Sequence, residues 1–324
     1  MGINSDNFVD KYAANILDES TNLVKEYKSA RFKGWIFILV GFIISILVFR
    51  SNPNLLIFIA LGFFALVGVC FAYISNAKNP LLALRGRVRK QVVEGVLSER
   101  ADNVIFNQNG RREIDFRYDI GSVLPTYDRY SSEDFISGKI EEKEFGFYEV
   151  KLEEKHEEKD KDGKTKIRWE NVFRGYIIFF DFETRYDGYI RLAPNSRFGQ
   201  LFDGLRSDER IKLESTEFEK QFDVYADDQI AARTVVTPKF MQKFSELATS
   251  TIFNKDVNAI FKTLRGKSSP FHGFIDNKRM NIAVYSFDDK FELPPLTEPI
   301  DVKEFAGKIK EDFNILFEFI NATK

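Results

Sequence analysis

The chain is poor in the residues that build the common metal centres and nucleophilic catalysts. It has one cysteine, Cys70, and two histidines, His156 and His272, in 324 residues. Structural zinc sites take four ligands mainly from cysteine and histidine, and Cys70 lies inside a long apolar run that suits lipid. These residues therefore exclude a Cys/His zinc site, a Cys–His nucleophile and an internal disulfide. We predict no resident metal and no cofactor.

An excess of positive charge is also missing, and so are glycine-rich phosphate loops. Lys+Arg number 47 against 49 Asp+Glu, for a formal net charge of −2, so we expect no nucleic-acid partner. "GKT" (Gly163–Thr165) and "GKS" (Gly266–Ser268) resemble the end of a phosphate loop, but the glycine five places earlier is absent in both. Neither can therefore cradle a phosphate.

Two long uncharged runs are present. They extend from Gly34 to Phe49 and from Asn54 to Ala77. A helix that crosses the ~30 Å hydrocarbon core needs about 20 mainly apolar residues, and Lys33 and Arg50 can reach the interfaces from the ends of the shorter run. We predict a transmembrane helical hairpin over residues 34–77, with spans at 34–50 and 54–75.

Basic residues flank this hairpin and predict its orientation. Lys78 to Lys90 carries five bases and no acid, and four more bases precede the first span, whereas the link between the spans has only Arg50. The positive-inside rule then places both termini in the cytoplasm. The bases after the second span are also candidates for contact with anionic lipid headgroups, worth ~1 kcal/mol each, although a topology signal on a solvated face is the simpler interpretation. These candidates are Arg85, Arg87, Arg89 and Lys90.

The segments next to the hairpin have helical periodicity. Residues 1–33 form a predicted N-terminal helix whose apolar positions recur with the 4-3 spacing of a coiled-coil seam, which fits either self-association or packing on the protein's own residues. Residues 78–100 form a predicted basic juxtamembrane helix. The seam is Val9, Ala13, Ile16, Ser20, Leu23, Tyr27 and Ala30, and the second helix has its apolar face at Leu81, Leu84, Val88, Val92 and Val96.

Residues 101–324 form one predicted cytoplasmic domain. Alternation at Tyr148, Val150 and Leu152, a charged tip at 153–166 with an Asp162–Gly163 turn, and the apolar return "VFRGYIIFFDF" predict a long hairpin. "DGYIRLAP" and "QFDVY" indicate further strands, and "PFHGFIDNKRMNIAVYSF" indicates a hairpin turning near Asp276–Asn277. A closing helix follows, with its apolar face at Val302, Phe305, Ile309, Phe313, Leu316 and Ile320. The fold class is therefore α+β: an N-terminal helix, a transmembrane hairpin, and a domain of mostly antiparallel sheet with flanking helices.

Three stretches carry a resemblance to a known family. "YDRYSSEDFISGKI" (127–140), "FEKQFDVYADDQIAARTVVTP" (218–238) and "FIDNKRMNIAV" (274–284) resemble a bacterial family of two-span membrane proteins, catalogued as a domain of unknown function, number three-one-three-seven. Ser132, Ala231 and Thr234 depart from the residues usual there. The resemblance implies the inner, cytoplasmic membrane as the location and assigns no activity.

The paired carboxylates Asp227 and Asp228, with Arg233 after them, are the first candidate for chemistry. They stand where a predicted strand becomes a predicted helix, so helix capping accounts for them without a ligand. Thr237 before Pro238 repeats the same start signal. Capping is the favoured interpretation and a ligand site the alternative.

The segment "YDRYSSEDF" is the second candidate. Because magnesium often takes only one or two protein carboxylates, an ion site is open here, although Ser131 or Ser132 before Asp134 more simply predicts a capped turn and a short helix. His272 reads as a partly buried strand residue rather than a catalytic base. The ligand or partner candidates of this segment are Tyr127, Asp128, Arg129, Tyr130, Glu133 and Asp134.

Three functions follow from these patterns. The first is a non-enzymatic, membrane-anchored binding or scaffold module that engages a protein partner or a second copy of itself. The second is a metal-dependent membrane-bound enzyme that uses the carboxylates Asp128, Glu133, Asp227 and Asp228, which requires the two candidate segments to meet in space. The third is a sensor of anionic lipid that uses Arg85 to Lys90.

Overall fold

The computed structural model describes residues 5–110, 124–159, 164–182, 188–194, 209–250, 271–276, 278–286 and 289–323. The chain divides into two compact units. A helical unit comprises residues 1–95 and 291–307, and a sheet unit comprises residues 96–290 and 308–324.

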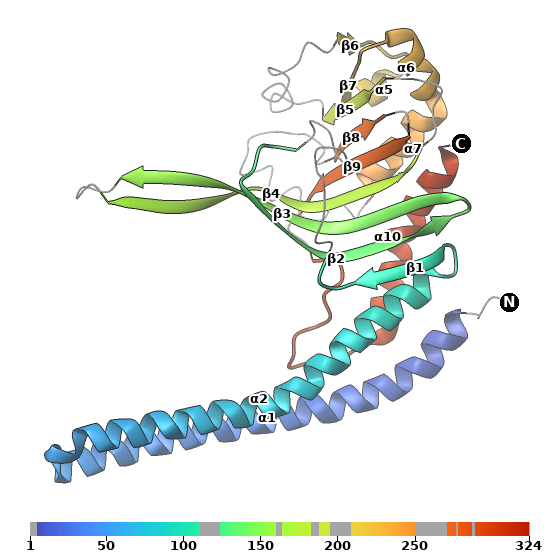
Figure 1. The fold of residues 1–324 in the computed structure, drawn as a ribbon. Coiled ribbons are helices and arrows are strands. Elements are labelled where there is room, and N and C mark those ends of the chain that lie inside the picture. The colour runs from blue at the N-terminus through green and yellow to red at the C-terminus, as the bar shows by residue number, and fades with distance from the viewer. Residues whose placement is uncertain are drawn as a thin grey trace. The chain divides into compact units, whose positions relative to one another are not determined.

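Two long helices make up most of the helical unit. Helix α1 (Ser5–Ser51) and helix α2 (Leu56–Leu97) run side by side, joined by the short 3-10 helix η1 (Pro53–Leu55) (Figure 1). Pro53 stands at the start of η1, where its missing N–H costs nothing. The helices are long and apolar enough to cross a membrane, and only 6% of the most apolar window of each is buried. Side chains this apolar and this exposed suit a lipid environment.

The apolar parts of α1 and α2 contact one another through small residues. A Cβ added to Gly41 would lie 2.1 Å from Leu66 Cδ2, and one added to Gly34 would lie 2.7 Å from Ile74 Cδ1. The rings of Phe42 and Phe63 have centroids 5.8 Å apart. Glycine therefore permits the close approach of the two helices at these positions, as small residues do between membrane helices.

The predicted seam lies in the polar part of α1, and several of its residues are buried within the helical unit. Ala13, Ile16, Ser20 and Ala30 are all buried, whereas Leu23 and Tyr27 of the same seam are only partly buried. All five predicted apolar positions of α2 between residues 81 and 96 are buried as well. The side chain of Val9, the first seam position, lies outside the described residues. The buried seam residues pack within the protein's own helical unit, so the seam gives no separate support for self-association.

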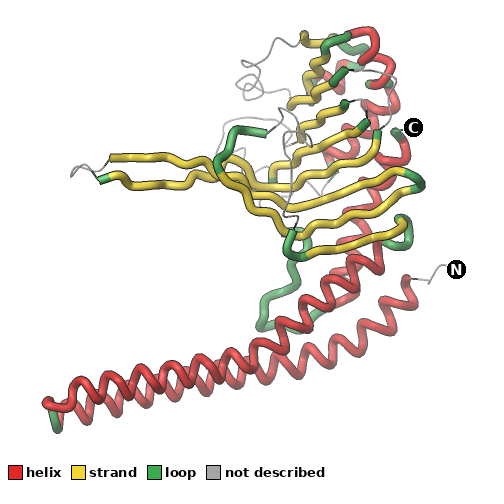
Figure 2. The backbone as a smooth tube through the Cα atoms, in the orientation of Figure 1, coloured by secondary structure: helices red, strands yellow, loops and turns green. Residues whose placement is uncertain are grey.

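The sheet unit contains one nine-stranded sheet in which the described pairings are antiparallel. Its strand order is β1-β2-β3-β4-β9-β8-β5-β7-β6, and Figure 2 shows the strands as one continuous layer. The strands are β1 (Asp102–Asn107), β2 (Arg129–Ile140), β3 (Lys143–Lys159), β4 (Thr165–Asp181), β5 (Ile190–Pro194), β6 (Glu209–Ile211), β7 (Phe222–Ala226), β8 (Phe271–Ile275) and β9 (Arg279–Tyr285).

Helices cover one face of this sheet through an aromatic layer. The helices of the region are α5 (Thr216–Glu219), α6 (Gln229–Val235), α7 (Pro238–Thr249) and α10 (Val302–Ala322). The ring of Phe145 lies 5.3 Å from that of Phe317, Phe180 lies 5.8 Å from Phe319, and Phe244 of α7 lies 5.9 Å from Phe319. Buried aromatic pairs such as these account for much of the chain's phenylalanine.

The predicted α+β class, with N-terminal helices and an antiparallel sheet flanked by helices, is confirmed. The central strand β4, the hairpin β8–β9 and the closing helix α10 are present. Asp276 accepts hydrogen bonds from the N–H groups of Lys278 and Arg279 at the β8–β9 turn. The predicted turn residues Asp162 and Gly163 lie outside the described residues.

The predicted short helix after Ser131 and Ser132 is wrong. These residues lie in β2, which pairs with β1 and β3. Asp134 is the irregular point, with φ +51°, and the register against β3 shifts between Glu133 and Ile136. A serine–acid pattern suits a helix cap, but here it marks a β-bulge, which the local pattern does not distinguish.

Candidate functional site

The two candidate segments do not meet. The first lies along β2 and the second follows β7, six strand steps away in the sheet order. At about 4.8 Å a step the segments are on the order of 25–30 Å apart. The four carboxylates Asp128, Glu133, Asp227 and Asp228 therefore do not assemble one centre.

Asp227 and Asp228 have structural partners. Asp228 is the N-cap of α6, and its Oδ1 accepts hydrogen bonds from Ile230 N at 2.9 Å and Ala231 N at 3.1 Å. Asp227 Oδ1 accepts from Tyr189 N at 3.3 Å. Arg233 donates to the carbonyl of Lys212 at 3.1 Å rather than to a carboxylate. The capping interpretation accounts for this stretch, as it does for Thr237, whose side chain accepts from Phe240 N.

Residues 127–130 brace the base of the β3–β4 hairpin. Asp128 Oδ2 accepts a hydrogen bond from Lys155 N at 2.6 Å. Arg129 Nε donates to Glu153 Oε2 at 2.8 Å, and its guanidinium lies 3.8 Å from the ring centroid of Trp169. Hydrogen bonds from Arg129 and then Lys151 lower the pKa of Glu153 to about 2. This ion-pair network holds both strands where they leave the sheet.

The hairpin beyond this base extends as a two-stranded ribbon, which we define as residues 154–159 of β3 and 165–170 of β4. It projects away from the rest of the sheet (Figure 1). The two strands pair from Glu154↔Glu170 to Lys159↔Thr165, and every residue of the β4 arm is exposed.

The two faces of the ribbon differ. Strand alternation places Ile167 and Trp169 on one face, and their side chains are 52% and 36% exposed. The opposite face carries only polar and charged side chains. They are Glu154, His156, Glu158, Lys166, Arg168 and Glu170, and His156 Nε2 lies 3.5 Å from Glu170 Oε2.

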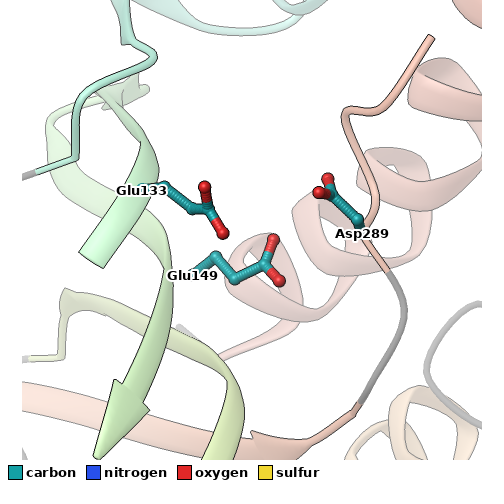
Figure 3. Close-up of side chains that lie close together, drawn as sticks. All are labelled: Glu133, Glu149 and Asp289. Atoms are coloured by element: carbon teal, nitrogen blue, oxygen red, sulfur yellow. The ribbon is translucent and has the colours of Figure 1, made fainter. Parts of the chain in front are cut away.

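A cluster of carboxylates lies elsewhere in the same unit. Glu133 of β2 and Glu149 of β3 are direct cross-strand partners, and Asp289 follows β9. One carboxylate oxygen from each lies within 4.8 Å of the others. Figure 3 shows the three side chains pointing toward one another from three separate segments.

Glu149 is the central member of this cluster. Its exposure is 2%, and neither carboxylate oxygen has a hydrogen-bond partner among the described residues. Arg174 Nη2 lies 3.8 Å from Oε1, an ion pair without hydrogen-bond geometry. Burial, followed by the charges of Asp289, Glu133 and Asp134, raises the pKa of Glu149 to about 8, and Arg174 opposes the shift.

Open space adjoins the cluster. A cavity of about 250 Å³ is lined by Glu133 and Glu149 together with Ser131, Ser132, Val150, Lys151 and Arg174. Among these lining groups Lys151 is paired with Glu153 at 2.9 Å. Nearby, Lys290 is paired with Asp312 of α10 at 3.6 Å. Both lysines are therefore engaged with other carboxylates.

Sequence reasoning found Glu133 and Asp134 but missed Glu149 and Asp289. Glu149 stands at a position where the alternating pattern of the strand predicts an exposed polar residue. Asp289 lies 140 positions further along the chain. Only one local signal marks Glu149: it stands inside "FGFYEV", Phe145–Val150, where all six residues are buried. The three carboxylates come together because of the strand register, which cannot be read from a local sequence pattern.

The four lipid-headgroup candidates are largely engaged within the helical unit. Arg85 is buried and donates to the carbonyl of Pro294. Arg87 pairs with Glu19 at 2.8 Å, and Lys90 lies 3.9 Å from Glu94. Arg89 is partly buried. Because Arg85 and Arg87 have partners within the helical unit, the support for a lipid-headgroup site at these residues is reduced.

The family resemblance is confirmed for the C-terminal part of the chain. Residues 171–324 match the family model described as "Protein of unknown function (DUF3137)". The match begins near the base of the ribbon in β4 and includes neither α1 nor α2.

Comparison with solved structures gives a remote likeness. The crystal structure of the mycobacterial trehalose monomycolate transport factor A, TtfA, is 9% identical, with a TM-score of 0.35, and the match covers 74% of this chain and 95% of that chain. A likeness of this size carries no functional argument. No curated protein matches the chain.

Proposed function

We propose that this protein is a membrane-anchored binding module whose sheet unit engages a protein partner through the β3–β4 ribbon. The helices α1 and α2 are the anchor. Their exposed apolar side chains between Phe32 and Tyr73 support insertion in a bilayer. The distribution of basic residues supports the inner membrane with both termini, and hence the sheet unit, on the cytoplasmic side.

The observation that carries the partner proposal is the two-faced ribbon. An isolated two-stranded ribbon gains little stability by itself, yet here a network of Arg129, Glu153, Lys151 and Trp169 fixes its base. Exposed Ile167 and Trp169 provide an apolar spot rimmed by charge, which is the usual anatomy of a protein–protein contact. The charged opposite face and the many Lys and Glu residues oppose edge-to-edge aggregation.

The enzyme and lipid-sensor alternatives have less support. The enzyme alternative needs residues 127–134 and 225–233 together, whereas the sheet order separates them. The lipid alternative needs free bases, but Arg85 and Arg87 have partners within the helical unit.

The direct test is co-purification of the full chain from the membranes of the cells that make it, followed by mass spectrometry. One variant replaces residues 156–168 by Asn-Gly, a two-residue hairpin turn that closes on the Lys155↔Trp169 pair. Because the described residues of the deleted segment are exposed or only partly buried, we expect the variant to fold and to lose the partner.

A matched pair of point variants separates the two faces. Ile167→Ser changes the apolar face and Arg168→Ser the adjacent position on the charged face. We expect Ile167→Ser to reduce partner recovery at least about tenfold, the scale of a hot-spot side chain, and Arg168→Ser to retain most of it. Equal recovery with all the variants would rule out the ribbon as the contact.

A further inference from the structure

We propose that Glu133, Glu149 and Asp289 form a binding site for one divalent cation of the oxygen-preferring class, Mg²⁺, Ca²⁺ or Mn²⁺. The proposal is independent of the partner-binding role, because it involves no residue of the ribbon. It also differs from the enzyme alternative considered above, of whose carboxylates it retains only Glu133.

The geometry of the three carboxylates suits such an ion. Ligand oxygens lie about 2.0–2.6 Å from Mg²⁺ or Ca²⁺, so two ligands on opposite sides of the ion stand about 4–5 Å apart. The three carboxylates offer oxygens within 4.8 Å of one another. Small side-chain rotations are then enough to close the site, without a change of strand register.

The burial of Glu149 is a second observation that supports a cation site. A carboxylate that is 98% buried is normally satisfied by hydrogen bonds or ion pairs. Neither oxygen of Glu149 has a hydrogen-bond partner among the described residues, and the carboxylates of Glu133 and Asp289 point toward it (Figure 3). A single proton neutralises one member of such a cluster, whereas a divalent cation attracts all three.

The surroundings leave room for the rest of a coordination shell. The adjoining cavity of about 250 Å³ admits several waters, and Ser131 and Ser132 are among the residues that line it. In the part of the chain that the structure describes, Arg174 is the basic residue paired with the buried carboxylate, at 3.8 Å. The bulge at Asp134 re-aims the β2 side chains at this point, as bulges near functional sites do.

The three ligands come from separate segments of the sheet unit. Glu133 and Glu149 are paired in the β2–β3 ladder, and Asp289 follows β9 in the chain. A cation bound by all three would therefore link Asp289 to the β2–β3 pair.

The test is titration of the full chain, purified in detergent and freed of metal with EDTA, with Mn²⁺ at pH 8. Electron paramagnetic resonance measures the free Mn²⁺, and Mg²⁺ and Ca²⁺ are added as competitors. We expect saturable binding of one ion per chain. Glu149→Gln should weaken binding at least about tenfold, because it removes the charge of the central ligand.

Two further variants keep the test decisive. Asp289→Asn removes a less buried ligand and serves if Glu149→Gln fails to fold, and Glu154→Gln on the ribbon is the matched control outside the cluster. Mn²⁺ should raise the midpoint of thermal unfolding of the wild type and of Glu154→Gln, but not of Glu149→Gln or Asp289→Asn. Absence of saturable binding in the wild type, or equal binding by all four proteins, would overturn the proposal.

Discussion

At the scale of single residues, Glu149 is the side chain whose surroundings least suit its charge. It is buried beside Glu133 and Asp289, with Asp134 nearby, and Arg174 is its positively charged partner among the described residues. Because burial and these acids favour the neutral form, the pKa of Glu149 rises from its ordinary 4.5 to about 8. The folded chain therefore holds a proton here that the unfolded chain releases at lower pH.

This shift predicts the pH dependence of stability in EDTA. Between pH 4.5 and about 8 the folded state binds the extra proton, so the free energy of unfolding should fall as the pH rises through that window, by about 1.4 kcal/mol for each unit of pKa shift at most. Glu149→Gln should flatten the slope and raise stability at pH 8. Chemical denaturation at a series of pH values measures this, and a slope unchanged by the substitution contradicts the assignment.

Asp228 makes a second prediction at this scale. Its side chain caps α6 with two hydrogen bonds, whereas Asp227 accepts one at 3.3 Å. Asp228→Ala should lower the free energy of local opening of α6 by about 0.5–2 kcal/mol, and Asp227→Ala by less. Hydrogen exchange of residues 229–236 gives both values. A larger effect at Asp227 would reverse the capping assignment.

At the scale of elements, what the sequence predicts depends on whether the signal is local. The apolar runs, the cap at Asp228 and the apolar face of α10 are patterns within one element, and they are present. At Asp134 the local pattern predicts the start of a helix, but the structure has a β-bulge there. Serine and acidic residues suit a helix cap and a bulge equally. The cluster of Glu133, Glu149 and Asp289 depends on register between distant segments, which no local pattern contains.

The link between α1 and the segment before α10 gives an element-scale prediction. Ser20, which is 0% exposed, accepts a hydrogen bond from Ile300 N at 3.1 Å. Ser20→Ala leaves this buried amide without its acceptor, at a cost of about 1–3 kcal/mol. Hydrogen exchange around residue 300 should therefore accelerate.

The neighbouring Thr21 is the control for this prediction. Its hydroxyl donates to Leu17 O within the exposed side of α1, so Thr21→Ala should leave exchange around residue 300 unchanged. If both substitutions leave it unchanged, the Ser20 hydrogen bond does not hold this segment.

At the scale of the whole molecule, the proposed topology predicts a labelling pattern. In a Cys70→Ala background, single cysteines are introduced by Asn52→Cys between α1 and η1 and by Ser98→Cys just after α2. A membrane-impermeant maleimide should label the first in intact cells and the second only after permeabilisation. Labelling of Ser98→Cys in intact cells would place the sheet unit on the other side of the membrane.

The central claim is that the ribbon contacts a protein partner, and site-specific photo-crosslinking tests it most directly. A photoreactive residue at Ile167 of the full chain, in its native membrane, should give a discrete adduct of higher mass, whose composition identifies a different protein or a second copy. The same residue at exposed Lys239 of α7 should not give that adduct. No adduct from position 167, or the same adduct from both positions, would contradict the account.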